Sequence, residues 1–343
     1  MNPDQPQWVL GLAGNDRGIR AALVQTDGAR IAALGPGAGR PWSRAEARQL
    51  AIGGAAAAEL AETAAAALAT ALCARSDAPL PVLAGLEINT AAAPDARIVA
   101  EILGLPVVWD FRSADRALGG AGRPLAPAFL HALARWRATP LPLAFLHLGR
   151  LATLCHADPA GADPGAGQTL ATLDAGPGPG MLPPRATGDA TGNVVKEIVQ
   201  MARDAGFRAR MPPRHITAAE LAGLGAALAG LGAADAAATL HALVADCVAD
   251  ALGLFPARPA ELLLTGPGRR DAPLRRALAG GLPVPVRSIE DAGLDDGWLS
   301  AASLAHLAMR IRRGLPTSFA ATTGVAAAVG GGQIARPAPA PPA

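Results

Sequence analysis

The same order of short apolar runs opens both halves of this chain, and this repetition limits the folds available to it. Each half begins with three apolar runs of strand length, separated first by a loop of small residues and then by a turn. In both halves, segments with helical patterning and further short apolar runs follow. The first three runs cover residues 8–13, 19–25 and 29–34, and the second three cover 143–148, 151–156 and 169–173.

Two α/β lobes that each begin with three such strands indicate an actin-like nucleotide-binding fold with a central cleft. We therefore expect an α/β protein with an N-terminal actin-like lobe over residues 1–126. A C-terminal actin-like lobe that carries nucleotide loops is expected over 127–335. The last residues, 336–343, contain only Pro, Ala and Arg and are expected to form a flexible tail, with fraying from Ile334.

Helix and strand signals assign most of the remaining chain. Ser43 stands three residues before Glu46, which is the spacing of a capping box and predicts one helix over 43–75. Further helices are expected over 95–103, 127–137, 192–206, 218–254 and 300–313, and from 272 onward. Further strands are expected over 82–88, 106–110 and 261–264.

Composition excludes several classes of protein. With 51% hydrophobic and 17% charged residues among 343, the chain can bury a large core, which excludes global disorder. A net charge of +2 gives no general field for nucleic acid or an anionic membrane, so neither is expected as a partner. Acidic residues interrupt the apolar stretches 56–72 and 221–254, which predicts helices of a soluble protein.

The cysteines and histidines indicate no metal site. Cys73, Cys155 and Cys247 lie far apart, which predicts free thiols in a reducing cytoplasm. The six histidines show neither an i,i+4 pair nor an HExxH spacing, so zinc is not expected. The first residues have no basic segment of a secretory signal.

A first glycine loop could hold phosphate between the first two predicted strands. A dinucleotide loop or P-loop would have to open a helix, but residues 19–25 predict a strand, and no GK[ST] follows. Backbone N–H groups of a hairpin loop can still bind phosphate. An ordinary hairpin turn is the alternative. The residues proposed to contact the nucleotide here are Gly11, Gly14, Asn15, Asp16, Arg17, Gly18 and Arg20.

A second loop begins with a carboxylate, Asp174, at the end of a predicted strand. Gly176, Pro177 and Gly178 follow, and glycine would let the backbone approach a ligand closely. The carboxylate would suit a general base or a magnesium anchor. A solvated Asp before a flexible turn explains the segment equally well.

A third loop lies between the predicted strand 261–264 and the helix from 272. Gly266, Gly268 and Arg269 would form a platform for adenine or ribose. The alternative is a strand-to-helix loop whose arginines are merely solvated.

Residues 110–129 resemble a known family. The run DFRSADRALGGAGRPLAPAF is similar to the DFR–D–ALGG–G–PL–PAF signature of bacterial anhydro-N-acetylmuramic acid kinases. The second loop resembles that family's D-T-G-P-G-N loop, and residues 265–271 resemble its glycine-rich strand-to-helix loop. The order of the motifs agrees from Trp8 to Ile334, nearly the whole chain.

The resemblance implies an actin-like sugar kinase that uses ATP and Mg²⁺ in cytoplasmic peptidoglycan recycling. Its substrate would be an amino sugar, 1,6-anhydro-N-acetylmuramic acid, whose anhydro bridge is opened by water and whose freed 6-oxygen is phosphorylated. Asp174 matches the position of the family's catalytic base. The resemblance also allows a homodimer. The residues implied to line the sugar are Asp110, Arg112, Asp115, Gly119 and Gly120.

Some family motifs differ here, and they leave a second function open. The family's first loop reads G-T-S-x-D-G-x-D, whereas this chain has GNDRGIR over 14–20, without the hydroxyls and with Arg20 at the second Asp position. The family's H-G-Q-T motif is replaced by LEINT over 86–90. The alternative is a catalytically degenerate relative that binds sugar or a protein. A nicotinamide-dependent reductase would rest on Gly11–Gly18 alone, and the strand after that loop argues against it.

Overall fold

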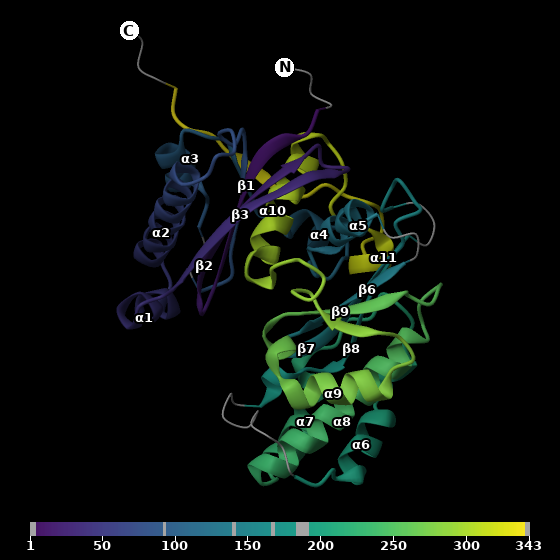
Figure 1. Cartoon of the computed structure of the whole chain (residues 1–343). Helices are drawn as coiled ribbons and strands as arrows, with labels where there is room; N and C mark the ends of the chain where they lie inside the picture. The colour runs from purple at the N-terminus through teal and green to yellow at the C-terminus, as the bar shows by residue number, and fades with distance from the viewer. Residues whose placement is uncertain (1–4, 92–93, 139–141, 166–168, 183–191, 340–343) are drawn as a thin grey trace. The chain divides into compact units, whose positions relative to one another are not determined.

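The computed structural model describes residues 5–91, 94–138, 142–165, 169–182 and 192–339, and it divides the chain into two compact units (Figure 1). The first unit comprises Met1–Arg137 and Asp295–Ala343, and the second comprises Ala138–Leu294. This division differs from the predicted lobes 1–126 and 127–335. The reason is packing, because the helices at 127–136 and 296–312 contact elements of the first unit.

The sheet of the first unit has the strand order β11-β5-β4-β1-β2-β3. The first three strands run antiparallel to one another, as predicted, and β4 and β5 join them in parallel. Ile334, predicted to begin a frayed tail, instead pairs with Val108 in the edge strand β11. The strands are β1 (Gln7–Asn15), β2 (Gly18–Thr26), β3 (Ile31–Pro41), β4 (Ala84–Ile88), β5 (Val107–Trp109) and β11 (Gln333–Ala335).

The sheet of the second unit repeats this topology. Its order is β10-β9-β6-β7-β8, which corresponds strand for strand to β5-β4-β1-β2-β3. Again three antiparallel strands come first and two parallel strands follow. The predicted duplication, and with it the α/β actin-like fold class, is confirmed. The strands are β6 (Leu143–Leu148), β7 (Leu151–Ala157), β8 (Leu170–Pro177), β9 (Glu261–Thr265) and β10 (Val286–Ser288).

Helices cover both faces of the first sheet (Figure 1). The predicted capping box at Ser43 is confirmed, but the helix predicted over 43–75 is two helices. They separate at Gly53 and Gly54, whose φ angles of +78° and +82° cannot continue a helix. The helices are α1 (Arg44–Ile52), α2 (Ala55–Ala74), α3 (Arg97–Leu103), α4 (Ser113–Ala117), α5 (Pro127–Trp136), α10 (Asp296–Arg312) and α11 (Ala320–Thr323).

In the second unit, the helix predicted over 218–254 is also divided. It ends at Ala229 and resumes at Ala233, because Gly230 and Gly232 favour termination. The second of the two helices, over Ala233–Leu252, packs its apolar side against β7 and β8 in the core. The helices are α6 (Lys196–Arg203), α7 (Ala218–Ala229), α8 (Ala233–Leu252) and α9 (Ala272–Gly281), with short 3₁₀ turns η1 (Pro179–Met181), η3 (Gly206–Ala209) and η4 (Pro267–Arg270).

Within the described ranges, α2 alone is long and apolar enough to cross a membrane, judged by length and composition. Its alanines at 57, 61, 65 and 69 are fully buried. They pack in one core with Leu10, Leu12 and Leu23 of the sheet. In this unit, α2 is therefore a core helix that covers one face of the sheet.

On the opposite face, glycines let α10 approach the sheet closely. A Cβ atom added at Gly11 would lie 1.7 Å from the Ala301 carbonyl oxygen, and one at Gly85 would lie 2.3 Å from that of Leu304. Gly11 was predicted to contact nucleotide. The structure shows that its missing side chain is required by helix packing.

The same helix buries a histidine that links α10 to β2. His306 Nδ1 lies 2.9 Å from Thr26 Oγ1, and that hydroxyl donates to the Arg30 carbonyl oxygen at 2.7 Å. Because the hydroxyl proton lies in the bond to Arg30, Thr26 Oγ1 can only accept from His306. The Nδ1 atom of His306 is therefore the donor. Burial, together with nearby Arg310, lowers the pKa of His306 from 6.5 to about 3.

Replacing His306 with Gln should make the stability less sensitive to acid. The folded protein keeps His306 neutral to about pH 3, whereas the unfolded chain protonates it near pH 6.5. Stability from this group is therefore present above pH 6.5 and falls as the pH drops. Between pH 6 and 4, His306→Gln should reduce the slope of unfolding free energy against pH by about 1.4 kcal/mol per unit. Urea unfolding at several pH values measures this, and parallel slopes would contradict it.

Candidate active site

Asp174 lies near the end of β8 with its carboxylate held by two protein donors. The residue is 1% exposed. The Thr153 hydroxyl donates to Oδ1 at 2.8 Å, and the Ile216 backbone N–H donates to Oδ2 at 2.8 Å. The carboxylate is therefore fixed in orientation, which excludes the alternative of a solvated Asp before a flexible turn.

The backbone around Asp174 is fixed by Arg214, a residue that no sequence pattern marked as part of the site. Arg214 is 1% exposed, and its guanidinium donates to the carbonyl oxygens of Asp174 at 2.8 Å and Ala175 at 3.4 Å. The Asp174 N–H in turn donates to the Arg214 carbonyl oxygen at 2.8 Å. Burial lowers the pKa of Arg214 below the ordinary value. Further donors of the guanidinium reach the carbonyl oxygens of Phe207, Arg208 and Arg210.

The glycines of the second loop are required by close contacts with the protein. A Cβ atom at Gly176 would lie 2.8 Å from Cys247 Sγ, and one at Gly178 would lie 2.3 Å from the Gly149 carbonyl oxygen. The N–H groups of Gly178 and Gly180 donate to the carbonyl oxygens of Arg150 and Gly149 at 2.8 and 2.9 Å. The loop is thus attached to the turn between β6 and β7, and Pro177 is its last strand residue.

The third loop lies against the second. Gly266 has φ +76°, and a Cβ atom there would lie 2.8 Å from His147 Cε1. At Gly268 it would lie 2.3 Å from Pro179 Cγ of the second loop. Two of the three predicted nucleotide loops therefore meet within the second unit, together with the turn at Gly149.

Arg269 in this loop is not solvated, contrary to the alternative interpretation. It is 4% exposed and forms an ion pair with Glu290, with Nε 2.7 Å and Nη2 2.5 Å from Oε1. Nη1 also donates to the Gly266 carbonyl oxygen at 2.9 Å. The bond from Arg269 lowers the pKa of Glu290. Arg269 therefore supports the loop from within the protein.

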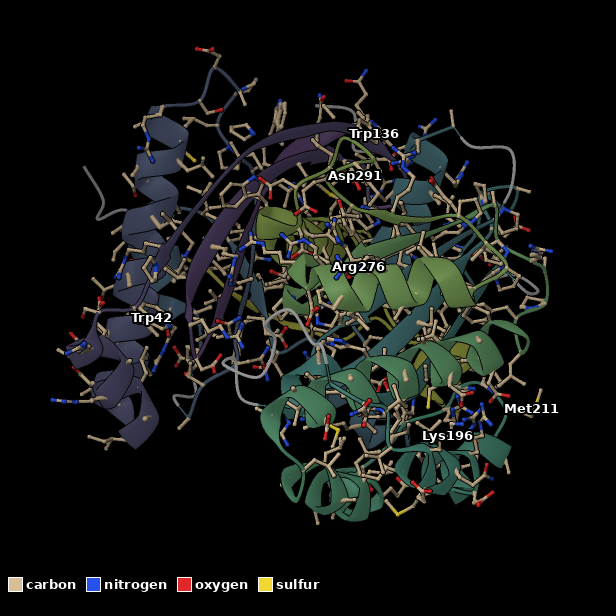
Figure 2. The ribbon with its side chains drawn as sticks, turned by 60° about the horizontal axis from the view of Figure 1, so that its bottom comes forward. Trp42, Trp136, Lys196, Met211, Arg276 and Asp291 are labelled. Atoms are coloured by element: carbon tan, nitrogen blue, oxygen red, sulfur yellow. The ribbon has the colours of Figure 1, made fainter. Side chains whose placement is uncertain are left out.

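The first predicted loop is a tight hairpin in the first unit. Asn15 pairs with Gly18, so only Asp16 and Arg17 form the turn. The Trp42 indole N–H donates to the Asn15 carbonyl oxygen at 2.6 Å. Trp42 lies just before α1 (Figure 2), so this bond attaches the hairpin to the start of that helix. A Cβ atom at Gly14 would lie 3.1 Å from the side chains of Ile19 and Ile88, and one at Gly18 would lie 2.3 Å from the Arg40 carbonyl oxygen.

Arg20 lies on the sheet face that α10 covers. Gly39 is its partner on β3, and a Cβ atom there would lie 3.3 Å from Arg20 Cγ and 3.4 Å from Trp298. Arg20 is half-buried, whereas Arg17 is exposed. The two arginines of the hairpin therefore occupy different environments.

The signature segment 110–129 folds around the carboxylate of Asp115. This residue is 1% exposed, and its carboxylate accepts from the Gly122 N–H at 2.6 Å and the Thr323 hydroxyl at 2.5 Å. A Cβ atom at Gly120 would lie 2.2 Å from Asp115 Oδ1, and Gly119 has φ +83°. Asp115, Gly119 and Gly120 therefore shape the segment.

The other polar residues of this segment are more open. Arg112 forms an ion pair with Glu87 at 2.5 Å and also donates to the Gly122 carbonyl oxygen. Asp110, with φ +53°, accepts from the Ser113 hydroxyl at 2.7 Å. Glu87 comes from LEINT, where the family has H-G-Q-T, so an acid now partners the signature arginine.

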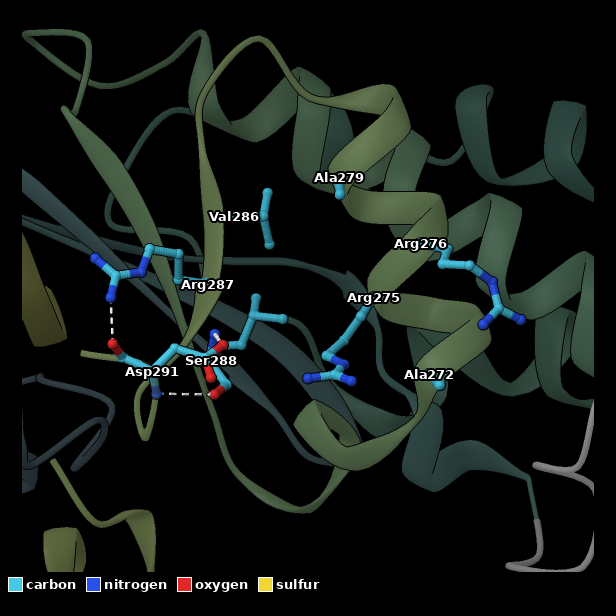
Figure 3. A pocket seen from close by; sticks show the side chains of 9 residues that line it. Ala272, Arg275, Arg276, Ala279, Val286, Arg287, Ser288 and Asp291 are labelled. Atoms are coloured by element: carbon cyan, nitrogen blue, oxygen red, sulfur yellow. Dashed lines mark hydrogen bonds between the residues drawn. The ribbon is translucent and has the colours of Figure 1, made fainter. Parts of the chain in front are cut away.

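A separate pocket of about 250 Å³ lies between α9 and β10 (Figure 3). Arg275 and Arg276 come from α9, while Arg287, Ser288 and Asp291 come from β10 and the segment after it. None of these residues belongs to the predicted site. Among the described residues, no group of three or more His, Cys, Asp or Glu could hold a metal ion.

The duplicated topology gives this chain the two-lobed actin-like fold of sugar kinases. Residues 83–337 match the family model of anhydro-N-acetylmuramic acid kinase. The anhydro-N-acetylmuramic acid kinase of Cereibacter sphaeroides is 39% identical over 96% of this chain and 96% of its own. Anhydro-N-acetylmuramic acid kinase 1 of Jannaschia sp. is 36% identical over 97% and 96%. The chain belongs to the anhydro-N-acetylmuramic acid kinase family.

Replacing Arg214 with Lys should destabilise the protein by about 3 kcal/mol. Lysine cannot supply the separate donors that several buried carbonyl oxygens need, and an unpaired buried polar group costs about 1–3 kcal/mol. Urea unfolding measures the change. The control is Arg210→Lys, which changes an exposed pair with Glu220 and should cost less than about 1 kcal/mol. Equal losses in both variants would contradict the role given to Arg214.

Proposed function

We propose that this protein is an ATP-dependent kinase that converts 1,6-anhydro-N-acetylmuramic acid to N-acetylmuramic acid 6-phosphate. The single observation that carries the proposal is the oriented Asp174 carboxylate next to two contacting glycine loops in one unit. Family membership supports both the substrate class and the use of ATP. Peptidoglycan recycling in the cytoplasm is the setting that this chemistry implies.

In the proposed reaction, Asp174 acts as the general base. It takes a proton from water as the water oxygen bonds to the anomeric carbon, and the bond from that carbon to the bridging 6-oxygen breaks. The 6-oxygen then bonds to the γ-phosphorus of ATP while the bond to the β-phosphate oxygen breaks, releasing ADP. Thr153 and Ile216 keep the carboxylate oriented for this proton transfer.

Magnesium fits the donors that the chain offers. Mg²⁺ is usually held by one or two carboxylates together with substrate phosphates, so a protein cage is not required. Asp16, exposed in the turn of the first hairpin, is a carboxylate that would hold the ion together with the phosphates. When bound, the ion neutralises charge on the transferring phosphoryl group.

Asp174→Asn should abolish phosphorylation and leave the fold intact. The amide keeps the size of the side chain but cannot take a proton, and loss of a general base costs about 10²–10⁴-fold in rate. Incubation with ATP, Mg²⁺ and the anhydro-sugar, followed by detection of the 6-phosphate, measures this. Asp163→Asn, in an exposed turn between β7 and β8, is the control. Full activity of Asp174→Asn would remove Asp174 from the mechanism.

A degenerate relative that binds sugar or protein is the second candidate, and the first hairpin favours it. The run GNDRGIR over 14–20 lacks the two hydroxyls of the family's first loop, and Arg20 stands at the position of its second Asp. Arginine can also neutralise phosphate charge directly, so the same substitution is compatible with nucleotide binding. The two functions therefore differ in whether Arg20 contributes to ATP affinity.

Under the kinase proposal, Arg20→Ala should weaken ATP binding about tenfold, the loss of one charged hydrogen bond. Calorimetric titration with ATP and Mg²⁺ measures the affinity. Arg48→Ala, an exposed position on α1, should bind as the wild type does. Equal affinities of wild type and Arg20→Ala would end the idea that arginine replaces the family's contacts. No binding by the wild type would favour the degenerate relative.

A further inference from the structure

The third glycine loop is joined to α8 by a buried pair that the proposed reaction does not use. His241 Nε2 lies 3.0 Å from Asp271 Oδ2, and the side chains are 6% and 5% exposed. Asp271 ends the loop and is the N-cap residue of α9. The pair therefore connects the core helix of this unit to the junction between loop and helix.

One carboxylate at this junction serves two partners. Asp271 Oδ1 accepts from the Leu274 N–H at 3.1 Å and caps α9, while Oδ2 faces His241. Burial alone would raise the pKa of Asp271, but the hydrogen bonds from His241 and Leu274 outweigh it, so the pKa lies below its ordinary value. The carboxylate is thus charged at neutral pH, and its bond to His241 is charge-assisted.

The loop has little freedom to absorb a movement of this junction. The Asp271 N–H donates to the Gly268 carbonyl oxygen at 3.0 Å, so the junction and the middle of the loop are directly bonded. A Cβ atom added at Gly268 would lie 2.3 Å from Pro179 Cγ and 2.8 Å from Leu148 Cβ, so no free space surrounds this residue. At Gly266 an added Cβ would lie 2.8 Å from His147 Cε1. A displacement of Asp271 would therefore move Gly268 against the second loop.

We propose that His241 is a positioning residue that holds the third loop, through Asp271, in the conformation that binds the nucleoside part of the phosphate donor. This inference rests on the proposed function, because ATP is there the ligand of the loop. His241 itself contacts no ligand. Its loss should therefore act on nucleotide affinity and leave the sugar side and the proton transfer at Asp174 unchanged.

The test compares His241→Ala and His241→Gln with a matched control. The control is Thr239→Val on the same helix. It removes a buried hydrogen bond, which Thr239 Oγ1 accepts from the Val195 N–H at 3.0 Å. Both residues are remote in sequence from the third loop. Amide hydrogen exchange over 266–271 without ligand reports the loop directly. Titration with ATP, together with KM for each substrate and kcat, reports how a change in the loop affects nucleotide binding and turnover.

His241→Ala should speed exchange in 266–271 by about tenfold and weaken ATP binding by a similar factor. Sugar KM and kcat should stay within about twofold of wild type, because only an interaction used in nucleotide binding is lost. His241→Gln keeps a donor near the position of Nε2 and should recover most of the affinity. Thr239→Val should match wild type in both measurements.

Unchanged ATP affinity of His241→Ala in a protein that does bind ATP would overturn the inference. The inference would also be overturned if amide exchange over 266–271 in His241→Ala were no faster than in Thr239→Val. An equal rise of the KM values for ATP and for the sugar would overturn it as well. If the wild type binds no ATP, the proposed function fails and the nucleotide role with it. The exchange measurement then still decides whether His241 positions the loop.

Discussion

The buried guanidinium of Arg214 holds the backbone that carries the proposed base, Asp174. It joins the end of β8 to the segment over 207–210 through carbonyl oxygens that would otherwise lie buried without donors. With the backbone of Asp174 held on both sides, Thr153 and Ile216 need only orient its carboxylate. The position of the proposed base therefore does not depend on the glycines that follow it in the chain.

Glycine serves two purposes in this fold, and sequence cannot separate them. A missing side chain admits either a ligand or a neighbouring part of the protein. At Gly11 the neighbour is α10, at Gly176 it is Cys247, and at Gly268 it is the second loop. These glycines bring elements into contact, and the nucleotide surface proposed here is built on those contacts.

The duplicated strand order could be predicted because apolar runs of strand length and turn residues are local signals. The helix breaks were missed because alanine-rich periodicity continues across Gly53 and Gly230, while termination depends on backbone angles and on how the next helix packs. Strand β11 was missed because its pairing with β5 joins residues more than two hundred positions apart. Arg214 could not be selected, and Asp115 was expected only to line the sugar, since only tertiary structure shows that an arginine or an aspartate is buried with its partners.

The energetics of the second unit bear on whether its site is a working one. Buried charged groups cost free energy even when paired, and apolar residues of similar volume often give equal or greater stability. Asp174 and Arg214 are each 1% exposed, and the side chains of His241 and Asp271 are nearly as well buried. A unit built for stability alone would gain from apolar side chains at these positions. These buried polar groups are concentrated around the second and third loops, whereas the first hairpin carries the exposed Arg17. The concentration indicates that the oriented polar groups serve ligand chemistry. This supports ligand binding at the two loops, which the proposed kinase requires.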